Sequence, residues 1–132
     1  MDEPRWVSRS SVEILHTRLI DLYGGADGVR DSSLVDSALA RPVHRWSYEP
    51  GCDLASLAAS YAYGLAKNHG FVDGNKRVAF AVMGVFLIRN GFLLDVPEEE
   101  ATRLMFEVAA GERTEAELTE WLRQHVVPVA AG

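Results

Sequence analysis

One apolar run, Val78-Ala-Phe-Ala-Val-Met-Gly-Val-Phe-Leu-Ile88, contains no charged residue. Its apolar side chains fall on every side of a helical wheel, which is typical of a helix packed on most of its faces. Asn75 precedes the run, and Asn90-Gly91 supplies the residue types that commonly end a helix. The run therefore predicts the central buried helix of the domain, around which the rest of the chain packs.

Three further helices are expected before this run. Ser10-Ser-Val-Glu13 has the form of a capping box, and Gly24-Gly25 is suited to closing the helix that it begins. Asp31 can cap a short second helix, which we expect to end at Pro42 because proline disfavours helical geometry in the residue before it. Asp53 is placed to cap the third.

Two helices are expected after the run. Pro97 and the glutamates behind it begin one that reaches about Gly111, and Thr114-Glu-Ala-Glu117 is a second capping box. Phe92-Leu-Leu94 is too short to support a sheet, and residues 126–132 are expected to form a tail without regular structure. The sequence thus predicts an all-α fold, one compact bundle-like domain of about six helices.

The composition fits a single globular domain. A chain of 132 residues can bury roughly two-thirds of the surface that it exposes when unfolded. Hydrophobic residues make up 48% and charged residues 24%, which favours a packed core over disorder. We therefore expect one domain over residues 1–132. The formal net charge of -6 argues against direct nucleic-acid binding, which relies on basic side chains.

The sequence shows no targeting segment, disulfide or metal-binding motif. Met1-Asp-Glu-Pro-Arg5 has neither the basic start nor the apolar stretch of a signal peptide, and no run is long enough to span a bilayer. A cytoplasmic protein without a membrane partner is expected. Cys52 is the lone cysteine and cannot form an internal disulfide. His16, His44 and His125 lack the spacing of a metal motif, so we expect them at the surface or at helix ends.

The chemistry is concentrated in the connection between two apolar helices, which reads His69-Gly-Phe-Val-Asp-Gly-Asn-Lys-Arg77. Histidine is the side chain whose ordinary pKa lies near neutrality, so His69 can accept a proton from an alcohol that attacks phosphorus and is the candidate general base. Asp73 offers a hard oxygen ligand, and Mg²⁺ bound to phosphates commonly uses only one or two protein carboxylates. Phe71 is expected to point inward and to anchor the loop.

The end of this loop has the features of a phosphate site. Gly74 permits a positive φ or a close backbone approach, and the helix that begins at Asn75 points its free N–H groups towards the loop. Arg77 can hold two phosphate oxygens in a fixed fork, while Lys76 acts as a mobile point charge. Each residue has a structural explanation by itself, as a cap, a turn or a solvated charge, but their combination favours catalysis. The catalytic candidates are His69, Asp73, Lys76 and Arg77, and the nucleotide-binding candidates are Gly74, Asn75, Lys76 and Arg77.

The pattern His69-x-Phe71-x-Asp73-Gly74-Asn75-Lys76-Arg77 resembles the signature loop of the Fic/Doc family. The resemblance covers about residues 11–123, the expected core of the domain. It implies an all-α fold, a histidine that acts as base, an acidic residue that holds Mg²⁺, and ATP as substrate bound by the residues from Gly74 to Arg77. Four more segments resemble the short Doc, or death-on-curing, branch: Gly28-Val-Arg-Asp31, Ser37-Ala-Leu-Ala-Arg-Pro42, Leu65-Ala-Lys-Asn-His69 and Asn90-Gly91.

Two positions distinguish the activities of this family. AMP-transferring members typically have glycine where this chain has Lys76 and arginine where it has Phe80. Both differences resemble the Doc branch, whose toxins transfer the γ-phosphate of ATP to a threonine of elongation factor Tu and so block translation. AMP transfer to a protein hydroxyl is the alternative within the family. A catalytically inactive nucleotide- or partner-binding module is the alternative from another class. Gly70 also departs from the proline common at its position.

The resemblance to Doc toxins further implies a type II toxin–antitoxin system. The expected partner is an antitoxin of the Phd type, whose disordered C-terminal segment folds as it binds the toxin. The self-inhibitory helix signature of some Fic proteins, Ser/Thr-x-x-x-Glu-Gly/Asn, does not occur in this sequence. Control by a separate protein is therefore expected.

Overall fold

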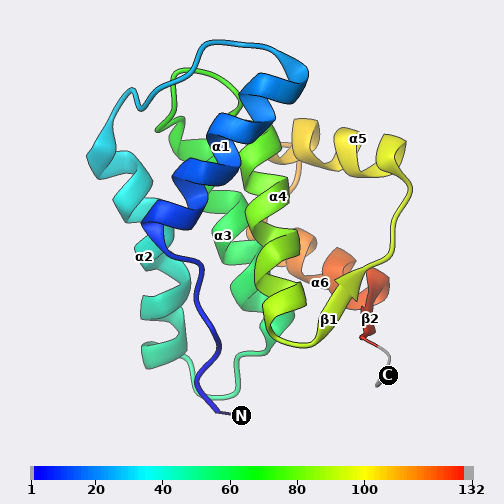
Figure 1. Cartoon of the computed structure of the whole chain (residues 1–132). Helices are drawn as coiled ribbons and strands as arrows, with labels where there is room; N and C mark the ends of the chain where they lie inside the picture. The colour runs from blue at the N-terminus through cyan, green and yellow to red at the C-terminus, as the bar shows by residue number, and fades with distance from the viewer. Residues whose placement is uncertain (1, 130–132) are drawn as a thin grey trace.

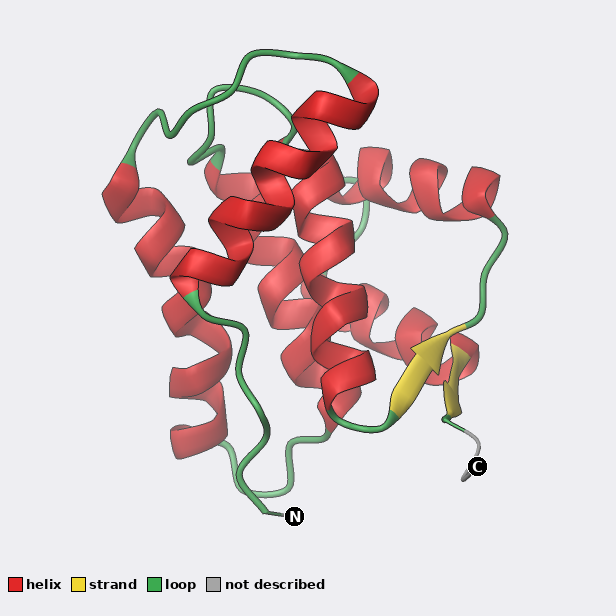
Figure 2. Ribbon diagram, in the orientation of Figure 1, coloured by secondary structure: helices red, strands yellow, loops and turns green. Residues whose placement is uncertain are grey.

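The computed structural model describes residues 2–129, which form six helices and one two-stranded sheet (Figure 2). In chain order the elements, labelled in Figure 1, are α1 (Arg9–Tyr23), α2 (Ser32–Tyr48), α3 (Leu54–Asn68), α4 (Asn75–Arg89), β1 (Phe92–Leu94), α5 (Glu98–Ala109), α6 (Glu115–His125) and β2 (Val126–Pro128). The predicted all-α fold of about six helices is confirmed. Within residues 2–129, no helix has both the length and the apolar character that crossing a membrane requires.

Helices α3 and α4 form the centre of the fold, and α3 is the more deeply buried of the two. Eleven of its 15 residues are buried, against seven of the 15 in α4. Helix α3 packs against α2, α4 and α6, and small residues such as Ala58 and Ala62 let these neighbours approach closely. The prediction that α4 belongs to the core is confirmed, since Val78, Val82 and Phe86 have no exposed surface. Burying each such side chain stabilises the fold by about 1.5–3 kcal/mol.

Two helix boundaries differ from the sequence prediction. The N-cap of α1 is Ser8, so the helix begins before the capping box predicted at Ser10. Helix α2 continues past Pro42, which is buried together with Val35 and Ala38. Ala38 lies on the face of α2 that packs against α3. The packing of this face stabilises the helix beyond the proline and outweighs the roughly 3 kcal/mol that an interior proline costs. The caps predicted at Asp31, Asp53 and Thr114 are confirmed.

The prediction that the chain has no strand pair is wrong. Leu93 of β1 pairs with Val127 of β2 in an antiparallel ladder, and the N–H of Asp95 donates to the carbonyl of His125 at 2.8 Å. The two strands are separated in sequence by α5 and α6, so no local pattern predicts that they pair. The predicted tail therefore begins with a strand, and its residues 130–132 lie outside the described part of the chain.

Two connections meet at one end of the bundle, at the top of Figure 1. They are residues 24–31 between α1 and α2, and residues 69–74 between α3 and α4. Val29 and Phe71 form an antiparallel bridge between them, and the N–H of Val72 donates to the carbonyl of Gly28 at 3.0 Å. The loop that carries the candidate catalytic residues is thus supported along its length by a second loop.

Candidate active site

His69 ends α3 in a left-handed conformation, with φ 51° and ψ 47°. It is the one residue other than glycine with a positive φ in the part of the chain that the structure describes, and such a conformation costs about 1–3 kcal/mol. Arg30 stabilises this helix end, because its Nε donates to the carbonyl of His69 at 2.8 Å and its Nη2 to that of Asn68 at 3.4 Å. His69 itself is exposed, so its imidazole is accessible to a substrate.

The turn after His69 is closely packed at Gly70. The Gly70 carbonyl accepts the N–H of Arg30 at 2.8 Å and that of Asp31 at 3.0 Å. A Cβ at Gly70 would lie 2.5 Å from Cγ2 of Val35 and 3.0 Å from its backbone nitrogen. The absence of a side chain at Gly70 therefore lets this turn pack closely against α2.

Phe71 and Asn75 are buried on the inner side of the loop and are hydrogen-bonded to each other. Phe71 is 2% exposed and Asn75 is 8% exposed. Oδ1 of Asn75 accepts the N–H of Phe71, and its Nδ2 donates to the Phe71 carbonyl, each at 3.0 Å. Because the Asn75 side chain is used in this way, its backbone N–H, the first of α4, is the group left for a phosphate.

His16 lies beneath the same loop. It was expected at the surface or at a helix end, and that prediction is wrong, because the side chain is 2% exposed. Its ring stacks on Phe71 with the centroids 4.0 Å apart and 17° between the planes. Nε2 lies 2.7 Å from the backbone oxygen of Asp73, and Nδ1 lies 3.4 Å from Oδ1 of Asp27. Both loops fold over the face of α1 that carries this histidine.

Asp73 presents an ionised carboxylate to solvent. Its Oδ1 accepts the N–H of Gly74 at 2.8 Å and its Oδ2 that of Ala26 at 3.4 Å. These two hydrogen bonds lower the pKa of Asp73 below its ordinary value, and the positive charge of Arg77 adds to the effect. Asp73 is exposed, and its oxygens have lone pairs beyond those two bonds. These properties suit a Mg²⁺ ligand.

The other histidines and acidic residues do not form a metal cluster. His44 is exposed on α2 and His125 ends α6, as expected. No group of three or more His, Cys, Asp or Glu side chains within residues 2–129 is arranged to hold a metal ion. A Mg²⁺ ion at Asp73 would therefore depend on phosphate and water oxygens for its remaining ligands.

Gly74 shapes the beginning of α4. It is the N-cap, with a φ of 75°, and it has no side chain to occupy the free N–H groups of the first turn. A Cβ at this position would lie 3.2 Å from Cδ1 of Ile20, so the glycine also brings the loop against α1. The helix start is thus open to an anion, which the helix dipole favours there.

Two cations stand at that helix start, each beside an aromatic ring. Nζ of Lys76 lies 4.8 Å from the ring centre of Phe106 on α5. Cζ of Arg77 lies 5.3 Å from the ring centre of Tyr23, and its Nη1 donates to the carbonyl of Gly24 at 3.1 Å. The helix dipole disfavours cations at this position; the aromatic contacts offset part of that cost, and an anionic ligand would offset more of it.

Sequence reasoning did not identify the residues that support the loop from other elements. Arg30 belongs to the Gly28-Val-Arg-Asp31 segment, whose resemblance to the family was noted without a role for the arginine. Phe106 lies far from the loop along the chain, and no sequence pattern indicated that it contacts Lys76. His16 was treated as a surface residue. The supporting residues that the structure adds are His16, Tyr23, Arg30 and Phe106.

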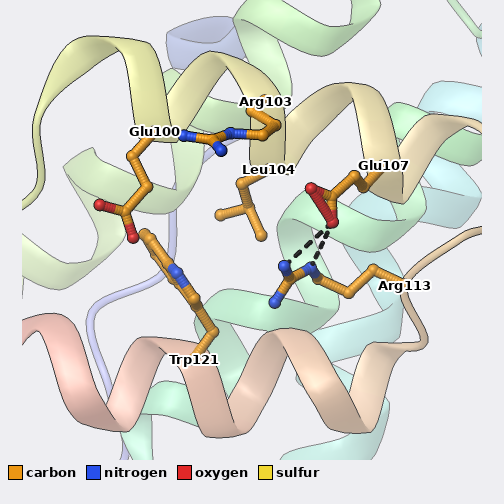
Figure 3. A pocket seen from close by; sticks show the side chains of 6 residues that line it. All are labelled: Glu100, Arg103, Leu104, Glu107, Arg113 and Trp121. Atoms are coloured by element: carbon orange, nitrogen blue, oxygen red, sulfur yellow. Dashed lines mark hydrogen bonds and ion pairs between the residues drawn. The ribbon is translucent and has the colours of Figure 1, made fainter.

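A separate cavity of about 320 Å³ lies between α5 and α6 (Figure 3). Arg113 forms part of its wall and donates from Nε and Nη2 to Oε2 of Glu107, at 3.2 Å and 3.0 Å. None of the cavity's lining residues belongs to the loop from His69 to Arg77. The lining residues are Glu100, Arg103, Leu104, Glu107, Arg113 and Trp121.

Residues 6–87 match the model of the Fic/DOC family, and the chain belongs to this family. The matched span includes the whole loop from His69 to Arg77. The chain is 33% identical over 121 residues to Protein kinase doc of Escherichia phage P1, which covers 91% of this chain and 94% of that protein. It is 42% identical over 90 residues to Toxin Doc of Mycolicibacterium smegmatis, which covers 66% of this chain and 69% of that protein. These relatives place it in the Doc branch.

Proposed function

We propose that this protein is a toxin that uses ATP to phosphorylate a threonine of elongation factor Tu and so blocks translation. The observation that carries the proposal is one loop that has an exposed His69 at its beginning and, at its end, a helix start that bears Lys76 and Arg77. A base, an anion-binding helix terminus and two cations are the groups that phosphoryl transfer requires. The names of the two relatives, a protein kinase and a toxin, support the same function.

In the proposed reaction, His69 accepts the proton of the threonine hydroxyl. The threonine oxygen forms the new bond to the γ-phosphorus, while the bond from that phosphorus to the β–γ bridging oxygen breaks and ADP leaves with the electron pair. Lys76, Arg77 and the free N–H groups at the start of α4 offset the negative charge of the phosphates during transfer. The left-handed backbone at His69 ends α3 at this residue, and the exposed imidazole is accessible to the hydroxyl of a substrate.

Asp73 is the residue of this chain that would hold Mg²⁺. Hydrogen bonds from Gly74 and Ala26 lower its pKa, so the carboxylate stays ionised at neutral pH. Magnesium bound there supplies positive charge that neutralises phosphate oxygens. The chain's own contribution is to fix the carboxylate between the two loops.

Phe80 favours phosphate transfer over AMP transfer. Members of the family that transfer AMP typically have an arginine at this position, one turn into the helix. The ring of Phe80 is half-buried and packs against the hydrophobic core, so this turn of α4 offers no second guanidinium group to a nucleotide. Lys76 in place of glycine supports the same choice.

The position of a radioactive label in ATP tests the proposal. Purified protein is incubated with Mg²⁺, elongation factor Tu and ATP labelled at either the α or the γ phosphate. Transfer of the γ label alone supports phosphorylation, while transfer of the α label overturns it in favour of AMP transfer. His69→Ala should abolish the reaction. His44→Ala, which changes an exposed histidine of α2, is the matched control and should keep the wild-type rate.

A catalytically inactive binding module is the competing function. Such a module would inhibit growth through its contacts alone, without the base or the phosphate-binding cation. Expression of the His69→Ala, Arg77→Ala double variant separates the two. Growth arrest that persists in this variant favours the binding module, and growth that recovers supports catalysis.

The proposed toxin acts in the bacterial cytoplasm and is controlled by an antitoxin of the Phd type. The two relatives named Doc support this partner. Co-expression with the neighbouring reading frame tests it. Co-purification together with restored growth supports an antitoxin, and the partner proposal fails if neither occurs.

A further inference from the structure

His16 lies near the middle of α1 and reaches, from inside the fold, the two loops that form the candidate active site. It is 2% exposed and shares the buried face of the helix with Val12 and Ile20. Burying a polar ring in such a position is costly unless its nitrogens have partners. The proposed reaction gives this histidine no task.

Each ring nitrogen of His16 lies near an oxygen atom of one of the two loops, and Nε2 forms a hydrogen bond. Nε2 lies 2.7 Å from the backbone oxygen of Asp73, and a carbonyl oxygen can only accept, so Nε2 carries a hydrogen and donates it. Nδ1 faces Oδ1 of Asp27 at 3.4 Å, and this oxygen accepts the N–H of Gly28 at 2.8 Å. His16 therefore links the catalytic loop to the connection between α1 and α2.

The face of the ring adds a packing contact that is separable from the hydrogen bond. The ring stacks on Phe71 with the centroids 4.0 Å apart. A Cβ at Gly74 would lie 3.6 Å from Nε2, so the ring also lies close beneath the helix start. Any flat apolar side chain could supply this packing. The carbonyl of Asp73, by contrast, requires a donor.

We infer that His16 is a positioning residue of the active site, whose Nε2 hydrogen fixes the Asp73 carbonyl and with it the direction of the Asp73 carboxylate and the first N–H groups of α4. Oδ1 of Asp73 accepts the N–H of Gly74 at 2.8 Å, so the carboxylate follows the backbone at these two residues. The inference rests on the proposed phosphate transfer, in which Asp73 and this helix start act on the nucleotide. Partners that orient a metal ligand typically contribute about 10- to 100-fold in activity or metal affinity.

Two substitutions separate the donor from the packing. His16→Phe keeps a flat ring against Phe71 and removes the N–H. His16→Gln removes the ring but can place an amide N–H near the position of Nε2. With elongation factor Tu as acceptor, we expect His16→Phe to lower kcat and to raise the Mg²⁺ concentration needed for the half-maximal rate, each by about 10- to 100-fold. KM for the acceptor stays unchanged, and His16→Gln recovers most of the lost kcat.

A purely structural role for His16 predicts a different result. Activity would then follow stability, so the Tm of each variant is measured together with its kinetics, and His44→Phe serves as a surface control. The inference is overturned if both variants lose activity in proportion to their loss of Tm. It is also overturned if His16→Phe keeps the wild-type kcat and Mg²⁺ dependence.

Hydrogen exchange distinguishes a failure of this inference from a failure of the proposed function. The N–H of Val72 donates to the carbonyl of Gly28, so its exchange rate reports whether the two loops stay together. If the wild type transfers neither label, the proposed function fails. Even then, the positioning role of His16 is supported if the N–H of Val72 exchanges about tenfold faster in His16→Phe and near the wild-type rate in His16→Gln. Equal exchange in all three proteins overturns it.

Discussion

The side chain of Asn75 encloses the backbone of Phe71, accepting its N–H and donating to its carbonyl, each at 3.0 Å. Asn75 is the first residue of α4, so this pair of bonds ties the start of the helix to the turn before it. The groups are buried, where a polar atom left without a partner costs about 1–3 kcal/mol. The side chain of a residue expected to bind nucleotide thus holds the shape of the loop.

Asn75→Asp should therefore destabilise the protein by about 1–3 kcal/mol at neutral pH. Aspartate can still accept the N–H of Phe71, but its second oxygen faces the Phe71 carbonyl where Nδ2 had donated, and two acceptors repel. Urea unfolding measures the loss. A protonated carboxyl can donate again, so the difference from the wild type should shrink in acid. A loss that is the same at pH 7 and in acid would contradict this explanation.

Gly70→Ala should cost about 1–3 kcal/mol, because the added methyl overlaps Cγ2 of Val35, 2.5 Å away. Shortening the neighbour relieves part of this overlap, although the backbone nitrogen of Val35 remains 3.0 Å from the new methyl. We expect Gly70→Ala to cost less in a Val35→Ala background than in the wild type. A double-mutant cycle by urea unfolding measures the coupling. Strictly additive losses would show that the two positions do not compete for space.

The buried face of α1 shows where sequence patterns fail for a physical reason. Ile14, Leu15, Leu19 and Leu22 have helical spacing in the sequence, which suggests that they form the inner face of the first helix, but Ile14 and Leu22 are 58% and 74% exposed. The buried stripe is Val12, His16 and Ile20. These residues have regular helical spacing, yet a histidine at the centre of a stripe is counted as polar, and the stripe is then assigned to solvent. Only the partners of a buried ring, which lie in other loops, show that it belongs inside.

In the candidate site, too, the residues of one segment could be predicted from the sequence, while the residues that support them from other elements could not. The proposed catalytic residues lie within the one segment from His69 to Arg77, so their spacing alone suggested phosphate chemistry. Their supports come from α1, α5 and the connection at Arg30, which only the tertiary fold brings to the loop. The strand pair was missed for the same reason, while helix caps such as Asp53 depend on neighbouring residues and were predicted correctly.

Phe106→Ala should raise KM for ATP by about two- to fivefold, the value of an exposed cation–π contact. The ring lies 4.8 Å from Nζ of Lys76 and is 59% exposed, so its loss frees the ammonium group without opening the core. Phe106→Tyr keeps the ring and should keep the wild-type KM. Phosphate-transfer kinetics over a range of ATP concentrations measures both variants. Equal KM values for Phe106→Ala and the wild type would show that the ring does not hold Lys76 for the nucleotide.

Asp53 links two helices through one carboxylate. Oδ1 caps α3 by accepting the N–H of Ser56 at 2.9 Å, and Oδ2 accepts from Nε of Arg123 on α6 at 2.8 Å. Burial acts to raise the pKa of Asp53, but the hydrogen bonds from Arg123 and Ser56 outweigh it and leave the pKa below its ordinary value. The folded state therefore favours the ionised form.

Asp53→Asn isolates that ionisation, because asparagine caps a helix about as well as aspartate does. A folded pKa below the unfolded value of about 3.9 means that the carboxylate adds stability above that pH and loses its contribution as the pH falls through the folded pKa. At pH 7 the wild type should be more stable by less than about 1 kcal/mol, since the Asp53 and Arg123 side chains are 47% and 48% exposed. Urea unfolding from neutral pH into acid should show the two stabilities converging, and added salt should narrow the gap at pH 7. A gap that persists or widens on acidification would mean that the cap, and not the charge, accounts for the contribution of Asp53.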